Sequence, residues 1–179
     1  MLNTCQDRLD QKLQHYGIQN EHSDMRVHVC VQAKEAWCYP TSQGVVTMYS
    51  FPKASAYQGG IKTGVGHLVP VDKIPFVRLL RTDPQWFDVF PVDQDWFGES
   101  QKGNLAVEIV CKIISAFNFP YLPTGWKTVD DVKLQVEGQD IILGPSRVQV
   151  KCDWKGGRKP KGTGNLFLQV EECNPWGKH

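Results

Sequence analysis

The sequence predicts an α+β fold, and this prediction rests on three observations. Residues 100–117 have the apolar periodicity of an amphipathic helix, strand-like segments follow that helix, and much of the first 95 residues is strand-like and rich in aromatic side chains. The chain has 179 residues, of which 41% are hydrophobic and 22% charged, an ordinary composition for a globular protein. A chain of this length can bury one sizeable core or two small ones.

The N-terminal part predicts one helix followed by strands. Residues 4–15 have a helical pattern that stops at Gly17, where a left-handed cap is easily adopted. Alternating side chains predict strands at residues 25–31 and 45–51, whereas Pro70 and Pro75 limit residues 67–80 to an edge strand or a loop. No sharp linker is visible. We distinguish an N-terminal region (1–95) from a C-terminal region (96–179), and the two can form a single domain.

The clearest helix runs from about residue 100 to residue 117. Ser100 can cap its start, and Pro120 stops any continuation. At about 100° per residue, one broad apolar stripe is formed by Leu105, Ala106, Ile109, Val110, Ile113, Ile114 and Phe117. Glu108 lies about 60° beyond the Leu105 edge of this stripe, so it is neither in the core nor opposite it. We expect Glu108 at the rim of a cleft.

Three strands are predicted after this helix, at residues 132–137 with a continuation at 140–143, at 147–154, and at 165–171. Alternation in the second strand places Gln149 and Lys151 on the face opposite Val148 and Val150. A Gly-Pro-Ser turn precedes this strand, and antiparallel pairing across the turn can bring Asp140 close to Gln149. An acidic residue, a side-chain carbonyl and a lysine then share one face.

This set of side chains suits metal-assisted hydrolysis of a phosphodiester. Asp140 can ligate Mg²⁺ with full charge, and Gln149 offers a neutral carbonyl oxygen that a hard cation also accepts. Lys151 can orient or help deprotonate the attacking water and stabilise the charged phosphorane. Glu108 is the natural second carboxylate. We therefore expect a catalytic group of Glu108, Asp140, Gln149 and Lys151, with Mg²⁺ or Mn²⁺ held by the three residues other than lysine.

The distribution of charge indicates a partner more clearly than the net charge of +1 does. Four basic residues fall in one short glycine-rich segment after residue 154: Lys155, Arg158, Lys159 and Lys161. A basic loop beside an acidic site suits contact with a phosphate backbone, and we predict that these four residues bind DNA. A solvated hairpin loop over residues 154–164 would have the same composition.

The remaining composition favours a cytoplasmic protein that does not contact membranes. No apolar run approaches about 18 residues, and the N-terminus lacks the layout of a signal peptide. The six cysteines form no CxxC pair, which favours reduced thiols over a disulfide framework or a zinc site. The five histidines have no paired metal spacing, so each is expected to be a surface or hydrogen-bonded residue.

Three segments, in chain order, resemble the PD-(D/E)xK nuclease superfamily: KGNLAVEIVCKII, GQDIIL and VQVKCDW. In that family a helix glutamate precedes an aspartate at a strand start, and a (D/E)xK tripeptide follows on the next strand. The resemblance covers about residues 99–175 and matches Glu108 to the glutamate, Asp140 to the aspartate and Lys151 to the lysine. Gln149 departs from the acidic consensus, and Gln-x-Lys variants occur among active members. The segment GTGNLFLQVEECNP is similar to the third strand of phage and restriction-type members.

The resemblance implies a restriction-endonuclease-like fold, with helices flanking a central mixed β-sheet, and a Mg²⁺-dependent endonuclease of the restriction or homing type acting on double-stranded DNA. The family core continues beyond its third strand, so we expect the N-terminal helix and strands, or the second subunit of a homodimer, to cover that sheet edge. Residues 18–95 would then contribute to DNA recognition. Two other functions stay open: a nuclease-fold protein that binds nucleic acid without cleaving it, and an unrelated β-rich interaction protein.

Overall fold

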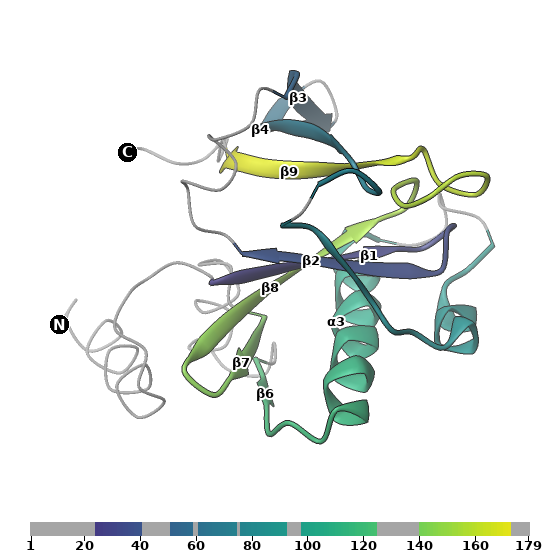
Figure 1. The fold of residues 1–179 in the computed structure, drawn as a ribbon, viewed down its shortest axis with the longest axis vertical. Coiled ribbons are helices and arrows are strands. Elements are labelled where there is room, and N and C mark those ends of the chain that lie inside the picture. Colours follow the sequence, from purple (N-terminus) through teal and green to yellow (C-terminus); the bar gives the residue numbers. More distant parts are fainter. Residues whose placement is uncertain are drawn as a thin grey trace, which may run out of the picture.

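The computed structural model describes residues 24–40, 51–58, 61–74, 76–92, 98–124 and 140–172. These residues form a six-stranded mixed sheet, a three-stranded antiparallel sheet and one long helix, so the α+β prediction is confirmed (Figure 1). The larger sheet has the order β5-β2-β1-β8-β7-β6, and its strands in chain order are β1 (Met25–Cys30), β2 (Glu35–Pro40), β5 (Arg78–Leu80), β6 (Leu122–Pro123), β7 (Ile141–Leu143) and β8 (Ser146–Asp153). The smaller sheet has the order β3 (Lys53–Gln58), β4 (Ile61–Pro70) and β9 (Asn165–Glu172).

The helix predicted at residues 100–117 is confirmed as α3 (Glu99–Ala116). Its N-cap is Gly98 and not Ser100, and the Gly98 N–H donates to Gln101 Oε1 at 3.3 Å. Most of the predicted apolar stripe is buried, but Phe117 is 54% exposed and stacks on Phe119. The helix ends before Phe117, so helical periodicity no longer determines where that side chain points.

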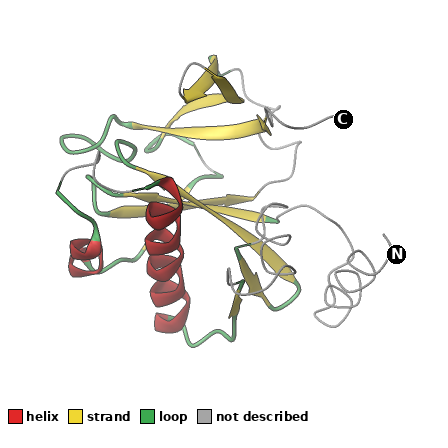
Figure 2. Cartoon of the chain, turned by 180° about the vertical axis from the view of Figure 1, so that it is seen from behind, coloured by secondary structure: helices red, strands yellow, loops and turns green. Residues whose placement is uncertain are grey.

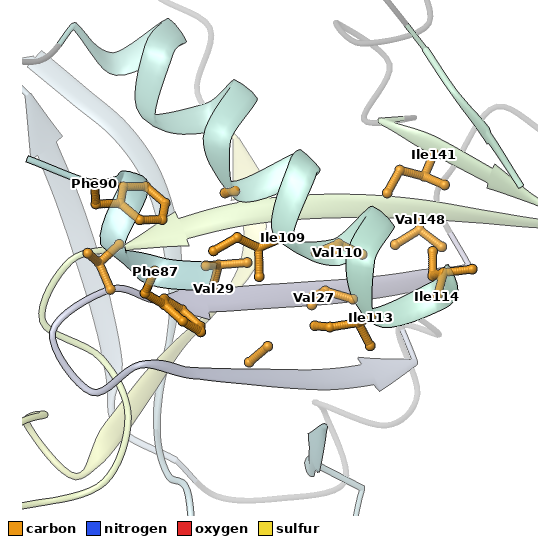
Figure 3. Close-up of a cluster of buried hydrophobic side chains, with 13 residues drawn as sticks. Val27, Val29, Phe87, Phe90, Ile109, Val110, Ile113, Ile114, Ile141 and Val148 are labelled. Atoms are coloured by element: carbon orange, nitrogen blue, oxygen red, sulfur yellow. The ribbon is translucent and has the colours of Figure 1, made fainter. Parts of the chain in front are cut away.

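The main core lies between α3 and one face of the larger sheet. Figure 3 shows side chains of α3 facing Val27 and Val29 of β1 and Val148 of β8. Phe87 and Phe90, in and just after the 3-10 helix η1 (Pro84–Val89), close one end of this cluster. Burial of such a continuous apolar surface is the main favourable contribution to this part of the fold.

The smaller sheet packs on the opposite face of the larger one. Trp37 and Tyr39 of β2 form a second buried cluster with Val69 of β4 and with Leu166 and Leu168 of β9. The molecule therefore has three layers, helix, large sheet and small sheet, which Figure 2 shows from behind. Both faces of the large sheet are covered where these clusters lie.

Each sheet combines strands from the two ends of the described chain. β1 pairs in parallel with β8, with Met25 opposite Val148, and β4 pairs antiparallel with β9. The N-terminal strands thus extend the sheet that contains β7 and β8. The segment 154–164 connects the two sheets, so its description as a hairpin loop is wrong. A glycine-rich composition is typical both of a hairpin loop within one sheet and of a loop that joins two different sheets, so composition alone could not separate them.

The expectation of an edge strand or a loop for residues 67–80 is wrong for residues 67–70. These residues end β4, which is the central strand of the smaller sheet. Pro70 is tolerated because it is the last residue of the strand. β5, in contrast, is an edge strand of the larger sheet.

The predicted helix at residues 4–15 and the strand at 132–137 lie outside the described residues, as does nearly all of the strand at 45–51. The four cysteines within the described part, Cys30, Cys38, Cys111 and Cys152, form no disulfide. Among the described residues, no helix is both long and apolar enough to span a membrane.

Candidate functional site

Asp140 directly precedes β7, and its side chain bonds to the backbone of β8. The Asp140 N–H donates to the Val148 carbonyl at 3.0 Å, and Asp140 Oδ2 accepts the Val150 N–H at 2.7 Å. The backbone N–H and the hydroxyl of Thr124 both donate to the Asp140 carbonyl, at 2.9 and 3.0 Å. These bonds fix the carboxylate beside Val150, the residue that separates Gln149 from Lys151.

The electrostatics of Asp140 combine burial with a neighbouring positive charge. Burial raises the pKa of the Asp140 carboxyl, whereas the Val150 N–H and the Lys151 ammonium favour the ionised form. Lys151 is therefore close enough to act on the carboxylate through its charge. A cation bound at Asp140 would, like Lys151, lower the pKa of the Asp140 carboxyl and favour its ionised form.

Gln149 is buried, with 8% of its surface exposed. Its Oε1 is also buried, and within the described part of the chain no donor reaches it. A buried amide oxygen without a donor is costly, so such an atom needs a functional or structural explanation. Hard divalent cations prefer oxygen ligands, and Gln149 Oε1, one residue before the Val150 N–H that bonds to the Asp140 carboxylate, is an atom of that kind.

Acidic and thiol side chains alone do not make a metal site here. Across the described ranges, no group of three or more His, Cys, Asp and Glu side chains is arranged to hold a metal ion. Among the described residues, the amide oxygen of Gln149 is the ligand that could join Asp140 at Mg²⁺, an ion that commonly retains several waters.

Glu108 is not brought together with Gln149 and Lys151. It is exposed on α3, and α3 packs on the sheet face that carries Val148 and Val150. Gln149 and Lys151 alternate with those valines and so lie on the face away from α3. The predicted alternation of this strand is correct, but it places the helix glutamate and the strand lysine on different sides of the sheet.

β1 adds two polar side chains that sequence reasoning missed. In the parallel pairing of β1 with β8, Arg26 lies opposite Gln149 and His28 opposite Lys151. His28 is 3% exposed, and its Nε2 lies 3.1 Å from the hydroxyl of Tyr39 on β2. Alternation in residues 25–31 identifies the polar face of β1, but nothing local in the sequence indicates that β1 lies beside β8.

The Tyr39 hydroxyl connects Arg26 and His28. Its oxygen accepts from the Arg26 guanidinium and lies 3.1 Å from His28 Nε2, to which it can either donate or accept, so both tautomers of a neutral His28 fit this contact. Burial, together with the nearby charges of Lys151 and Arg26, lowers the pKa of His28 to about 3. His28 is therefore neutral, and its Nδ1 is a buried atom for which the described residues provide no partner.

The four predicted DNA-binding residues fall into two groups. Lys155, Lys159 and Lys161 are exposed in the loop between β8 and β9. Arg158 instead forms an ion pair with Glu35, with Nε 2.7 Å from Oε1, and its guanidinium lies 5.8 Å from the centre of the Trp37 ring. The composition of the loop alone does not show which of its basic residues is held in an ion pair with a distant carboxylate.

A scan against protein-family models and searches of curated proteins and of solved structures found no match to this chain. The chemistry of these residues is therefore the basis on which a function is proposed.

Proposed function

We propose that the protein is a Mg²⁺-dependent endonuclease that hydrolyses phosphodiester bonds in double-stranded DNA, with a restriction-endonuclease-like fold. The observation that supports this most directly is the position of the Asp140 carboxylate, which bonds to Val150 between Gln149 and Lys151. A carboxylate and an amide oxygen can hold a divalent cation, and an ammonium can stabilise charge on the phosphate, which are two of the requirements of in-line hydrolysis of a phosphodiester. The proposal does not depend on Glu108.

Each residue then has a chemical role. Asp140 and Gln149 would hold Mg²⁺, or Mn²⁺ in its place, and the bound ion would neutralise charge that develops on the phosphate. The Lys151 ammonium orients the attacking water and donates to the phosphorane oxygens. The lysines of the loop after β8 contact the DNA backbone. A homodimer of the restriction or homing type would place two such centres on the two strands.

The test is nicking of supercoiled plasmid by the wild type and by Asp140→Asn, in Mg²⁺, Mn²⁺ or EDTA. Asparagine keeps an oxygen for the Val150 N–H while it removes the charge, so the fold should be retained. We expect cleavage to fall by a factor of about 10² or more, the scale for losing one electrostatic group in an active site. Asp72→Asn removes an exposed carboxylate and serves as the matched control. Equal nicking by the wild type and Asp140→Asn would refute the proposal.

A binding protein without cleavage activity is the second candidate. The absence of a three-residue acidic cluster among the described residues favours it, because one carboxylate and a neutral amide bind Mg²⁺ weakly. Retention of labelled duplex DNA by the wild type, with no nicking in millimolar Mg²⁺ or Mn²⁺, would support this candidate over the endonuclease.

A further inference from the structure

The loop of residues 154–164 is closed by its own backbone. Three hydrogen bonds of 2.8 Å join its ends: Gly162 to Arg158, Thr163 to Lys155 and Gly164 to Gly157. At its start, Asp153 Oδ1 accepts the N–H groups of Gly156 at 2.7 Å and of Lys155 at 3.2 Å. The loop therefore has a defined shape, and its lysines project from a fixed frame.

Glu35, the first residue of β2, fastens this frame to the large sheet. Its Oε1 accepts from Arg158 Nε at 2.7 Å, and its Oε2 accepts from the Arg158 backbone N–H at 3.0 Å and from Trp37 Nε1 at 3.0 Å. Burial opposes ionisation of Glu35, but the bonds from Arg158 and Trp37 outweigh it, so the pKa of Glu35 is lowered. The Glu35 side chain is 14% exposed.

The loop approaches the sheet so closely that only glycine fits at the point of contact. Gly157 has φ +94°, and a Cβ there would lie 2.7 Å from the Ala33 Cβ and 3.0 Å from Glu35 Oε2. The loop and the start of β2 thus form one packed unit, with Arg158 covering Trp37. Lys155, Lys159 and Lys161 remain on the outside of that unit.

We propose that Glu35 is a positioning residue for DNA binding, which holds the loop of residues 154–164 so that Lys155, Lys159 and Lys161 meet the phosphate backbone together. Arg158 is then part of this attachment and not a phosphate contact. This role rests on the proposed function, because the loop is the surface through which the proposed endonuclease would bind DNA.

The direction in which Glu35→Gln changes the affinity for DNA separates a positioning role from long-range electrostatic attraction. Glu35→Gln removes a negative charge beside a basic loop, so long-range attraction alone predicts tighter binding of DNA. A positioning role predicts weaker binding, because the loop must be ordered again when DNA binds. If Arg158 instead contacted phosphate and Glu35 merely competed for it, Arg158→Gln would weaken binding and Glu35→Gln would strengthen it.

Binding should be measured by fluorescence anisotropy with a short labelled duplex in EDTA, where cleavage cannot occur, over a series of salt concentrations. We expect Kd to rise about tenfold in both Glu35→Gln and Arg158→Gln. Asp88→Asn, which removes an exposed carboxylate paired with Lys34, is the matched control and should not weaken binding. Lys159→Gln should reduce the salt slope by about 0.9, whereas Lys112→Gln, on α3, should leave it unchanged.

Hydrogen exchange gives a second readout that does not require DNA. The amides of Gly162, Thr163 and Gly164 should exchange about tenfold faster in Glu35→Gln than in the wild type, while amides of α3 keep their protection. Unchanged exchange of the loop, or equal or tighter binding by Glu35→Gln, would overturn the positioning role alone. Wild-type protein that binds no duplex at all would overturn the proposed function, and the role of the loop in binding with it.

Discussion

His28→Gln should remove a specific part of the dependence of stability on pH. The pKa of His28 is lowered from 6.5 to about 3 by burial, to which the charges of Lys151 and Arg26 add. Between these two values the unfolded chain binds one proton at His28 that the folded chain does not bind. The contribution of His28 to stability is therefore fully present well above pH 6.5 and falls by roughly 1 kcal/mol for each pH unit of acidification below it. Between pH 6.5 and about pH 4.5 the loss from His28 is roughly 2 kcal/mol.

The assay is urea unfolding of the wild type and His28→Gln at a series of pH values across this window. Glutamine can still hydrogen-bond to the Tyr39 hydroxyl but cannot be protonated, so the variant should show the shallower dependence. His67→Gln is the control, since it replaces a histidine that bonds to the Phe51 carbonyl and leaves His28 in place. Parallel curves for the wild type and His28→Gln would refute the assignment of a neutral, buried His28.

Three further outcomes concern the proposed centre. Lys151→Met keeps the aliphatic stem and should reduce the single-turnover rate by orders of magnitude with only a modest change in DNA Kd, whereas a proportional fall in both would make Lys151 a phosphate contact. Gln149→Glu should lower the Mg²⁺ concentration needed for half-maximal cleavage and Gln149→Ala should raise it; the same value in all three proteins would place Gln149 away from the ion. Asp140→Asn should be at least as stable as the wild type in thermal melts at neutral pH, because burial disfavours the charge of Asp140, and clear destabilisation would contradict that account.

The parts of the fold that could be predicted are those with a strong local period. Eighteen residues with helical apolar spacing gave α3 to within about one residue at each end, and alternation gave β8 and the opposite faces of its side chains. The cap was misplaced because a glycine whose N–H bonds to Gln101 served where a serine was expected. Local patterns of this kind predict the element correctly because tertiary packing and intrinsic propensity favour the same structure.

What the sequence could not indicate is long-range pairing. His28 lies opposite Lys151 only because β1 and β8 are parallel neighbours, and no turn connects them whose residues could predict that register. The ion pair of Arg158 could not be predicted for the same reason, because its partner Glu35 is 123 residues away in the sequence. Counting basic residues in a loop identifies a charged segment, but burial and ion pairing decide which of those charges can meet a ligand.

The short length of β7 explains why Asp140 serves both the fold and the proposed chemistry. β7 pairs with residues 146–148 of β8, so the described ladder on that side ends where Gln149 begins. Beyond it, Oδ2 of Asp140 accepts the Val150 N–H, while β1 continues to pair along the other side of β8 as far as Asp153. An asparagine could meet the same backbone requirement without the cost of burying a charge. The sheet therefore does not require an acid at the end of this ladder, whereas the proposed metal site does.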